Sequence, residues 1–278
     1  RLLHIYVFNM IKKISQEDIL NIVNLYKTNL TMRDIAKLYN ITNSYVYKIL
    51  KTNGYVKKPQ HVIVNKKYSF DRNFFKKDSW QLAYVMGFAL ADGHIVNNKH
   101  SSILSYYVHK KDAIILEKIK EFVKATHPIF TSHTKSNMIQ ISISDSIFVD
   151  TLSKWGVVSN KTYNPVIPQI PKHVLKPFLI GLIDGDGTIK LSNKSQFGLV
   201  GNKDIMDFFI HSMKILGFTP DWKIYCKDSN IWKRVKLYKK NLIIELVKTL
   251  EPEKFFYLPR KWSAVLLCIK NNCLDKRK

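Results

Sequence analysis

Cysteine is scarce in this chain of 278 residues. Its cysteines are Cys226, Cys268 and Cys273, which are too few and too scattered for a disulfide framework or a zinc knuckle. The scarcity favours a reducing, intracellular compartment. We expect the cytoplasm of a bacterium or of a phage-infected cell, or an organelle matrix.

Long hydrophobic runs are also lacking. The longest lie around Leu82 to Ala91 and Phe178 to Ile183, well short of the roughly 20 residues that a membrane-spanning helix needs. No histidine pair has the spacing of a zinc-protease motif, and GDGTIK lacks the lysine-serine pattern of a phosphate-binding loop. We therefore expect a soluble protein without a membrane partner.

Acidic residues are few beside the basic ones. The chain has 21 Asp and Glu against 45 Lys and Arg, for a formal net charge of +24. Such an excess favours a polyanionic partner, because cationic side chains that neutralise phosphates release counterions from nucleic acid. An acidic membrane surface is the alternative that charge alone leaves open. The 46% hydrophobic content argues against disorder.

The N-terminal part predicts short helices over residues 15–26, 31–40 and 43–51, with Ser15, Thr31 and Thr42 at their starts. The stretch LTMRDIAKLYNITNSYVYKILK resembles a helix-turn-helix, whose second helix enters the major groove of DNA. A plain helical bundle is the alternative. We predict a DNA-binding domain over residues 11–56, with these residues facing DNA: Thr42, Asn43, Ser44, Tyr45, Tyr47, Lys48 and Lys51.

Residues 57–79 are rich in lysine and show little periodicity. We expect a basic linker along DNA phosphates, with Lys57 and Lys58 among the contacts.

From Trp80 onward the sequence repeats itself with variation. WQLAYVMGFALADG opens the first copy and KPFLIGLIDGDG the second, and each leads into strand-like and helical segments in the same order. Lys111 and Lys203 follow the first strands and are candidates for phosphate contacts. Each copy ends in a similar pair, Asn160-Lys161 or Arg260-Lys261. The repeat predicts two quasi-equivalent α+β halves, over residues 80–164 and 165–270.

Small residues recur four apart on the helix that opens each half. They are Ala83 and Gly87 in the first and Gly181 and Gly185 in the second. Residues at this spacing share one helix face, and small side chains let two backbones approach closely. We therefore predict that the two helices pack against each other through these residues.

Each of these helices ends in an acid followed by glycine, Asp92-Gly93 and Asp186-Gly187. We expect the glycine in the left-handed conformation that often ends a helix. The carboxylate lies at the negative end of the helix dipole, where a cation is needed to compensate it. Two such ends side by side predict an oxygen-rich site for Mg²⁺, and metal-assisted phosphodiester hydrolysis is the chemistry that suits it.

VMGFALADG and LIGLIDGDG resemble the two signature helices of the LAGLIDADG homing endonucleases, in the form that carries both in one chain. The resemblance implies a monomer with a pseudo-twofold pair of αββαββα units, whose antiparallel sheets form a saddle over double-stranded DNA. It implies cleavage of both strands across the minor groove at a long site, with Mg²⁺ or another hard cation such as Mn²⁺. Asp92 and Asp186 would be catalytic and would bind metal, assisted by the backbone carbonyls of Ala91 and Gly185.

The two copies also depart from this pattern. The sixth motif position is Asp184 in the second copy but Leu90 in the first, so we interpret Asp184 as a structural hydrogen-bonding group. Members of the family place a lysine near each active site, and we take Lys236 and Lys239 as candidates in the second half. The corresponding first-half segment, MIQISISDS, has no lysine. Tyr106 and Tyr225 are candidates for base contacts.

The resulting hypothesis is a site-specific double-strand DNA endonuclease of a mobile element, as in intron homing. A DNA-binding regulator that does not cleave, or an intron RNA maturase on the same fold, is the alternative.

Overall fold

The structure is a computed structural model that describes residues 14–28, 30–55, 67–97, 102–132, 136–192, 194–226 and 232–271. The chain divides into two compact units, unit 1 up to Lys66 and unit 2 from Lys67. The hydrophobic cores of the two units share no residue. Lys57 and Lys58 lie outside the described residues.

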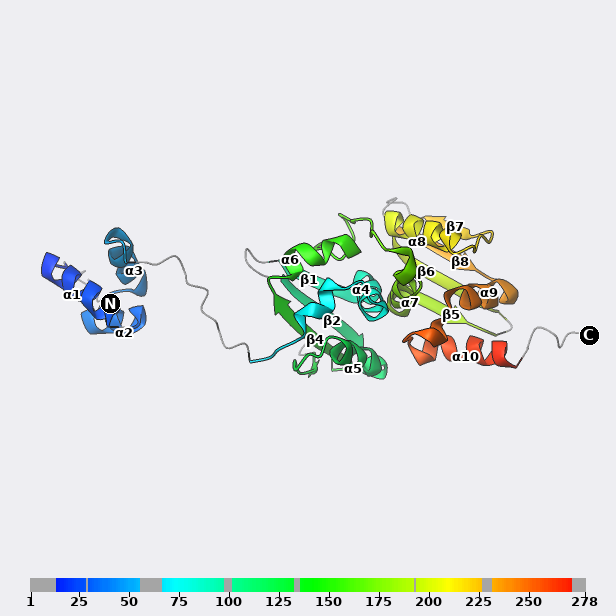
Figure 1. The fold of residues 1–278 in the computed structure, drawn as a ribbon, viewed down its shortest axis with the longest axis horizontal. Coiled ribbons are helices and arrows are strands. Elements are labelled where there is room, and N and C mark those ends of the chain that lie inside the picture. Colours follow the sequence, from blue (N-terminus) through cyan, green and yellow to red (C-terminus); the bar gives the residue numbers. More distant parts are fainter. Residues whose placement is uncertain are drawn as a thin grey trace, which may run out of the picture. The chain divides into compact units, whose positions relative to one another are not determined.

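Unit 1 consists of α1 (Gln16–Lys27), α2 (Met32–Tyr39) and α3 (Asn43–Thr52) (Figure 1). The predicted helix starts are confirmed, because the side chains of Ser15, Thr31 and Thr42 each accept a hydrogen bond from a backbone N–H in the first turn. Asn40 ends α2 in the left-handed conformation, at φ 53°. Isoleucine, valine and leucine side chains from all three helices form the small core.

The segment 67–79, expected as the end of the linker, is instead part of unit 2. The Ser69 side chain and backbone bond to Thr126, and Phe75 is 2% exposed in the main core. The ring of Phe75 packs edge-on against Phe148, with centroids 4.9 Å apart. Phenylalanines among the lysines anchor this stretch by hydrophobic burial, which the charge pattern does not reveal.

Unit 2 repeats the order αββαββα and ends in an additional helix, as the predicted α+β pair of units requires. The first half comprises α4 (Trp80–Asp92), β1 (Gly93–Asn97), β2 (Ser102–His109), α5 (Ala113–Phe122), β3 (Phe130–Thr131), β4 (Met138–Asp145) and α6 (Phe148–Thr151). The second comprises α7 (Leu175–Asp186), β5 (Gly187–Lys190), β6 (Gln196–Asn202), α8 (Lys203–Ile215), β7 (Lys223–Cys226), β8 (Trp232–Leu237) and α9 (Lys240–Leu250), followed by α10 (Pro259–Lys270).

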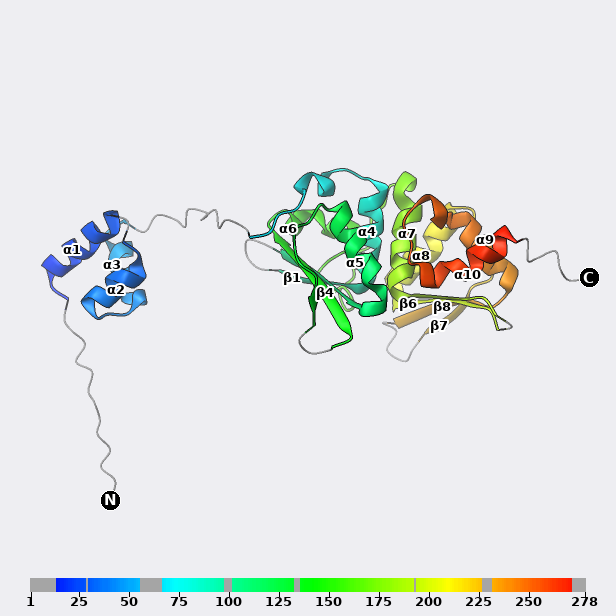
Figure 2. The ribbon, with the colours of Figure 1, turned by 90° about the horizontal axis from the view of Figure 1, so that it is seen from below.

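Each half contains a four-stranded antiparallel sheet, in the order β1-β2-β4-β3 or β5-β6-β8-β7. Helices cover one face of both sheets and leave the opposite face uncovered (Figure 2). Successive side chains of a strand point to opposite faces of the sheet. In β8, Val235 and Leu237 are buried beneath the helices, while Arg234 is exposed. Tyr106 is fully buried on the helix side, which contradicts its expected role in base contacts.

The helices α4 and α7 lie side by side at the centre of unit 2 (Figures 1 and 2). A side-chain carbon added to Gly87 would lie 1.9 Å from the carbonyl oxygen of Phe178 on α7. One added to Gly181 would lie 2.2 Å from the carbonyl oxygen of Tyr84 on α4. The backbones approach so closely that glycine is required at both positions. Ala83 is fully buried on α4.

Within the described residues, none of the helices combines the length and hydrophobicity required of a membrane span.

Candidate functional site

The C-terminal ends of α4 and α7 bring Asp92 and Asp186 together. A side-chain carbon at Gly185 would lie 2.2 Å from Cβ of Ala91 and 3.5 Å from Oδ2 of Asp92. The Asp92 carboxylate therefore lies beside the residue that precedes Asp186. Asp92 is exposed and Asp186 is half-buried, so solvent reaches this pair.

The glycines after the two acids are extended, not left-handed as expected. Gly93 has φ −73° and Gly187 has φ −90°, and each continues directly into a strand. Close approach explains the glycines instead, because a side-chain carbon at either position would lie 2.5 Å from a carbonyl oxygen of the preceding helix turn. The absence of a side chain lets each acid stand at the junction of helix and sheet.

The two carboxylates make the site electrostatically strained. Burial and the neighbouring Asp92 raise the pKa of Asp186 to about 7, against the opposing effect of Lys161 and Lys261. Although solvent reaches Asp92, its carboxylate is partly shielded by the neighbouring chain, and this partial loss of water raises its pKa while the same two lysines lower it. Both acids thus occupy positions where an additional cation would be stabilising.

A lysine holds each helix end. Lys161 donates hydrogen bonds to the carbonyl oxygens of Ala89, at 3.0 Å, and Gly93. Loss of water lowers the pKa of Lys161 to about 8, while Asp186 and Asp92 oppose that shift. Lys161 and Asp186 line the same pocket of about 120 Å³.

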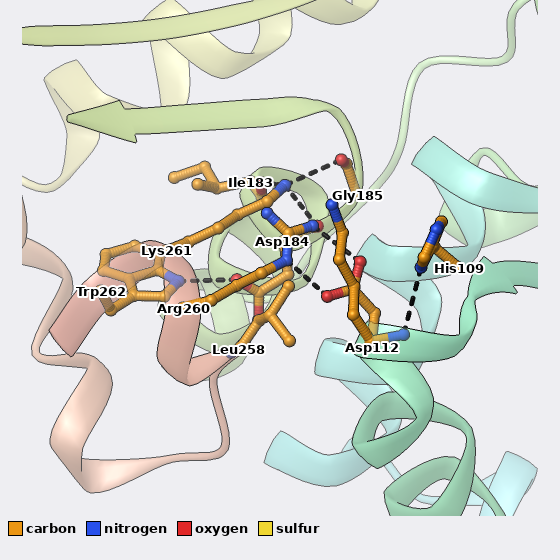
Figure 3. Close-up of polar contacts among 10 residues, drawn as sticks. His109, Asp112, Ile183, Asp184, Gly185, Leu258, Arg260, Lys261 and Trp262 are labelled. Carbon is orange, nitrogen blue, oxygen red and sulfur yellow. Dashed lines mark hydrogen bonds and ion pairs between the residues drawn. The ribbon is translucent and has the colours of Figure 1, made fainter. Parts of the chain in front are cut away.

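Lys261 holds the end of α7 in the corresponding way. Its Nζ donates to the carbonyl oxygens of Ile183 at 3.0 Å, Asp184 at 2.6 Å and Gly185 at 2.9 Å (Figure 3). Lys261 is 7% exposed, and loss of water lowers its pKa. The Gly185 carbonyl, predicted to contact metal, thus already accepts a hydrogen bond.

Sequence reasoning missed these two lysines as site residues. The available signal was the repeat itself, because Asn160-Lys161 and Arg260-Lys261 close the two halves at matching points. The family pattern instead directs attention to the strand lysines, Lys236 and Lys239. A lysine that reaches the site from a turn or from the first turn of a helix is not marked by the alternating pattern of a strand.

The two lysines proposed from the strands lie in different places. Lys236 lines a pocket of about 300 Å³ together with Asp186. Its Nζ lies over the rings of Tyr225 and Tyr238, at 5.2 and 5.6 Å from their centroids. Lys239 instead immediately precedes α9 and acts electrostatically on Asp221, so the structure does not bring it to the acids.

The strand register shows that the halves differ beside the acids. Lys236 pairs with Gly198 in the second sheet. Ser142 holds the corresponding position in the first sheet, where it pairs with Ser105 and their hydroxyls hydrogen-bond at 2.8 Å. The first sheet therefore has a serine where the second has Lys236. This agrees with the difference between the halves that we expect from the absence of lysine in MIQISISDS.

Asp184 has a buried structural position, in line with its interpretation from the sequence. Its carboxylate accepts hydrogen bonds from the Tyr84 hydroxyl and the Leu258 backbone N–H, both at 2.8 Å, and from Trp262 Nε1 at 2.6 Å. Burial raises the pKa of Asp184 to about 6 even though these donors lower it. Three donors satisfy the carboxylate and connect α4, α7 and the start of α10 (Figure 3 shows the α7 and α10 partners).

Apart from the buried Tyr106, the residues predicted to contact DNA are exposed wherever the structure describes them. On unit 1 these are Thr42, Asn43, Ser44, Tyr45, Tyr47, Lys48 and Lys51. On unit 2, Lys111 is exposed after β2, and Lys203 begins α8, where it forms an ion pair with Asp207 at 3.1 Å. The uncovered face of the second sheet adds Lys190, Arg234 and Lys236 around the Asp186 pocket.

Comparison with solved structures finds similar folds. The meganuclease I-SmaMI bound to uncleavable DNA has a TM-score of 0.46 and 15% identity, over 70% of this chain and 93% of that chain. The LAGLIDADG homing endonuclease I-LtrWI bound to target DNA has a TM-score of 0.48 and 12% identity, over 72% and 92%. I-GzeII, in complex with its DNA target, has a TM-score of 0.47 and 14% identity, over 71% and 92%. No known family profile and no curated protein matches the sequence.

Proposed function

We propose that this protein is a site-specific double-strand DNA endonuclease that hydrolyses phosphodiesters with a hard divalent cation, Mg²⁺ or Mn²⁺. The observation that carries the proposal is the meeting of Asp92 and Asp186 at the ends of two closely packed helices. They stand where both helices pass into sheets with an uncovered face. A DNA duplex would lie along the two uncovered sheets, with the phosphates that flank its minor groove brought to the acids through the cation.

The residues present fit a hard cation. Two carboxylates beside the negative ends of two helix dipoles form a site that a positive ion stabilises. Among the described residues no group of three His, Cys, Asp or Glu side chains could complete such a site. Backbone oxygens of Ala91 and Gly185, water and the DNA phosphate would supply the remaining ligands. A bound cation would stabilise negative charge on the phosphate and lower the pKa of a water molecule.

The chain's own residues would position the reacting groups. Lys161 and Lys261 fix the helix ends, and their positive charges stabilise Asp92 and Asp186 as carboxylates. Lys161, which donates to two carbonyl oxygens and lines the pocket shared with Asp186, would orient water there. The lysines would also attract the phosphate to the acids.

The uncovered sheets would bind the duplex on either side of the acids. Lys190, Arg234 and Lys236 supply positive charge for phosphates at the second half. The first half offers the neutral hydroxyls of Ser105 and Ser142 at the equivalent place. Unit 1 would add contacts through α3, where polar and basic side chains are exposed around the buried Val46 and Leu50.

Selection from a library of randomised duplexes tests the proposal. The protein is incubated with the library and Mg²⁺, and the cut ends are captured and sequenced. We expect one long consensus with breaks in both strands, which EDTA abolishes. Enrichment of a bound sequence without any metal-dependent break would overturn the proposal in favour of a regulator, and selective binding of structured intron RNA would favour a maturase.

A further inference from the structure

An ion pair joins the two halves of unit 2 next to Lys261. Arg260, in the first turn of α10, donates to both carboxylate oxygens of Asp112, with Nη2 2.7 Å from Oδ2 (Figure 3). Asp112 belongs to the first half, where it ends the short turn Lys110–Asp112 before α5. Asp112 is 7% exposed, whereas the Arg260 side chain is 45% exposed, so this two-point contact lies at the edge of the core with its arginine side open to solvent.

The ion pair completes a set of anchors around Lys261. On one side, Leu258 and Trp262 are bound to the buried carboxylate of Asp184. On the other side, Arg260 is bound to Asp112 across the boundary between the halves. Lys261 lies between these anchors with all three N–H groups donated to carbonyl oxygens. Its charge acts on Asp92 more strongly than that of Lys161 does.

Among the residues that the structure describes, the matching place beside Lys161 shows no such ion pair. Asn160 stands where the second half has Arg260, and its neutral amide cannot form an ion pair. Asp204, the counterpart of Asp112 after the strand, is exposed at the start of α8. Lys161 itself lies in a turn and makes two carbonyl hydrogen bonds. Lys261 is therefore fixed by three hydrogen bonds and a neighbouring ion pair, whereas Lys161 is fixed by two hydrogen bonds.

We propose that Arg260 is a positioning residue, which through Asp112 fixes Lys261 opposite Asp92 and so controls hydrolysis of one DNA strand but not of the other. This inference rests on the proposed endonuclease function. The ion pair holds the first turn of α10 in a fixed position relative to the first half. Without it, the segment that carries Lys261 keeps its packing against α7, β5 and α9 of the second half but loses its ion pair with the first half, and the placement of its charge relative to Asp92 becomes less precise.

Strand-resolved cleavage by the full-length protein tests the proposal. The substrate is the selected target duplex, labelled with a different fluorophore on each strand, and nicking of each strand is timed under single-turnover conditions with Mg²⁺. Arg260→Met should slow one strand about ten-fold and leave the other within about two-fold of wild type. The slowed strand should be the one that Lys261→Met slows more. Arg260→Lys, which keeps the charge, should restore part of the rate.

Two further variants separate positioning from other effects. Arg260→Met with Asp112→Asn removes both charges, and we expect its strand bias to persist, since the anchor is still missing. Asp204→Asn, the matched change in the other half, should leave the ratio of strand rates unchanged. Thermal unfolding and DNA binding in EDTA check that each variant is folded. Should Arg260→Met be unfolded, Asp112→Asn replaces it, with a smaller bias in the same direction.

The outcomes are distinct. Equal slowing of both strands by a folded Arg260→Met protein would overturn the positioning role and leave the endonuclease function intact. Recovery of the rate in the double variant would also overturn it, because the defect would then stem from the unpaired Asp112 carboxylate. Absence of any metal-dependent cutting by the wild type would overturn the function and the inference together.

Discussion

Lys161 and Asp186 come from different halves of unit 2, yet they line one pocket of about 120 Å³. The charge of Asp186 acts on Lys161 more strongly than that of Asp92, which belongs to the lysine's own half. Lys261 of the second half acts correspondingly on Asp92 of the first. Each acid is therefore paired with the lysine of the other half, and neither half contains a complete site.

The lysines should affect cleavage more than binding. We expect Lys161→Met and Lys261→Met each to reduce the single-turnover rate by about 10- to 100-fold, because each removes a positive charge that acts on Asp92 and Asp186. The dissociation constant in EDTA should change by less than about five-fold. Lys239→Met is the matched control, since Lys239 lies away from the acids, and it should cleave like the wild type. Equal losses in all three variants would contradict this assignment.

The acids should be required for chemistry and not for recognition. Asp92→Asn and Asp186→Asn keep the side-chain shape but remove the charge that holds a cation, so each should lower cleavage by about 100-fold or more. Binding without metal should be retained or strengthened, because a negative charge near the phosphates is lost. Gel shifts and timed cleavage on the same duplex measure both quantities. A variant that loses binding and cleavage in parallel would count against a catalytic role.

The raised pKa of Asp186 predicts a pH dependence of stability. Its pKa is about 7 in the folded protein against an ordinary value of 3.8. Between these values the folded state binds more protons than the unfolded state, so the free energy of unfolding falls as the pH rises through this window. Asp186→Asn should remove that decline and stabilise the metal-free protein at pH 7.5 by about 1–2 kcal/mol.

Thermal unfolding in EDTA between pH 5 and 8 measures this effect. Mg²⁺ should stabilise the wild type at pH 7.5 and have little effect on Asp186→Asn. Identical pH slopes for the two proteins would show that Asp186 is not held in a disfavoured charged state.

The close approach of α4 and α7 should make Gly87 intolerant of any side chain. A methyl group there meets the backbone carbonyl of Phe178, which cannot move aside as a flexible side chain would. We expect Gly87→Ala to destabilise unit 2 by about 1–3 kcal/mol, as overpacking of a core does. Gly198→Ala on β6 is the control, because its new carbon would lie 3.4 Å from the nearest neighbouring atom. Denaturant titration of both variants measures the difference.

Unit 1 should contribute to affinity without being needed for cleavage. Its core shares no residue with that of unit 2, so removal of residues 1–66 should leave a folded protein that still cuts at saturating concentration. Binding should weaken, and the slope of affinity against salt concentration should decrease, because phosphate contacts are lost. Lys48→Ala together with Lys51→Ala should reproduce part of this change. An unaltered salt slope would exclude unit 1 from the DNA interface.

The sequence predicts the local structure well where one short segment determines it. The helix starts at Ser15, Thr31 and Thr42 follow from capping side chains, which act within one turn. The order of the two halves follows from a repeat that places Asp92 and Asp186 at matching points. Burial of Phe75 was missed, because hydrophobic anchoring of an irregular segment depends on partners such as Phe148 that are distant in the sequence.

The candidate site depends more on contacts that cross between segments. The acids could be named from the sequence because they end recognisable helices. Lys161 and Lys261 are marked in the sequence only by their matching places at the ends of the two halves, since their hydrogen bonds go to backbone carbonyls, which every residue possesses. Tyr106 was misplaced for a related reason: a shift of one residue in register moves a strand side chain to the opposite face of the sheet.

The hydrogen bond between Tyr84 and Asp184 limits whether either half of unit 2 could form a homodimer on its own. At the matching motif positions the other helix carries Phe178 for Tyr84 and Leu90 for Asp184. A homodimer of second halves would pair each Asp184 with a phenyl ring that has no hydroxyl, and a homodimer of first halves would set each Tyr84 hydroxyl against leucine. Neither half can therefore serve unchanged as a symmetric building block, and splitting the gene would first require exchange of these residues.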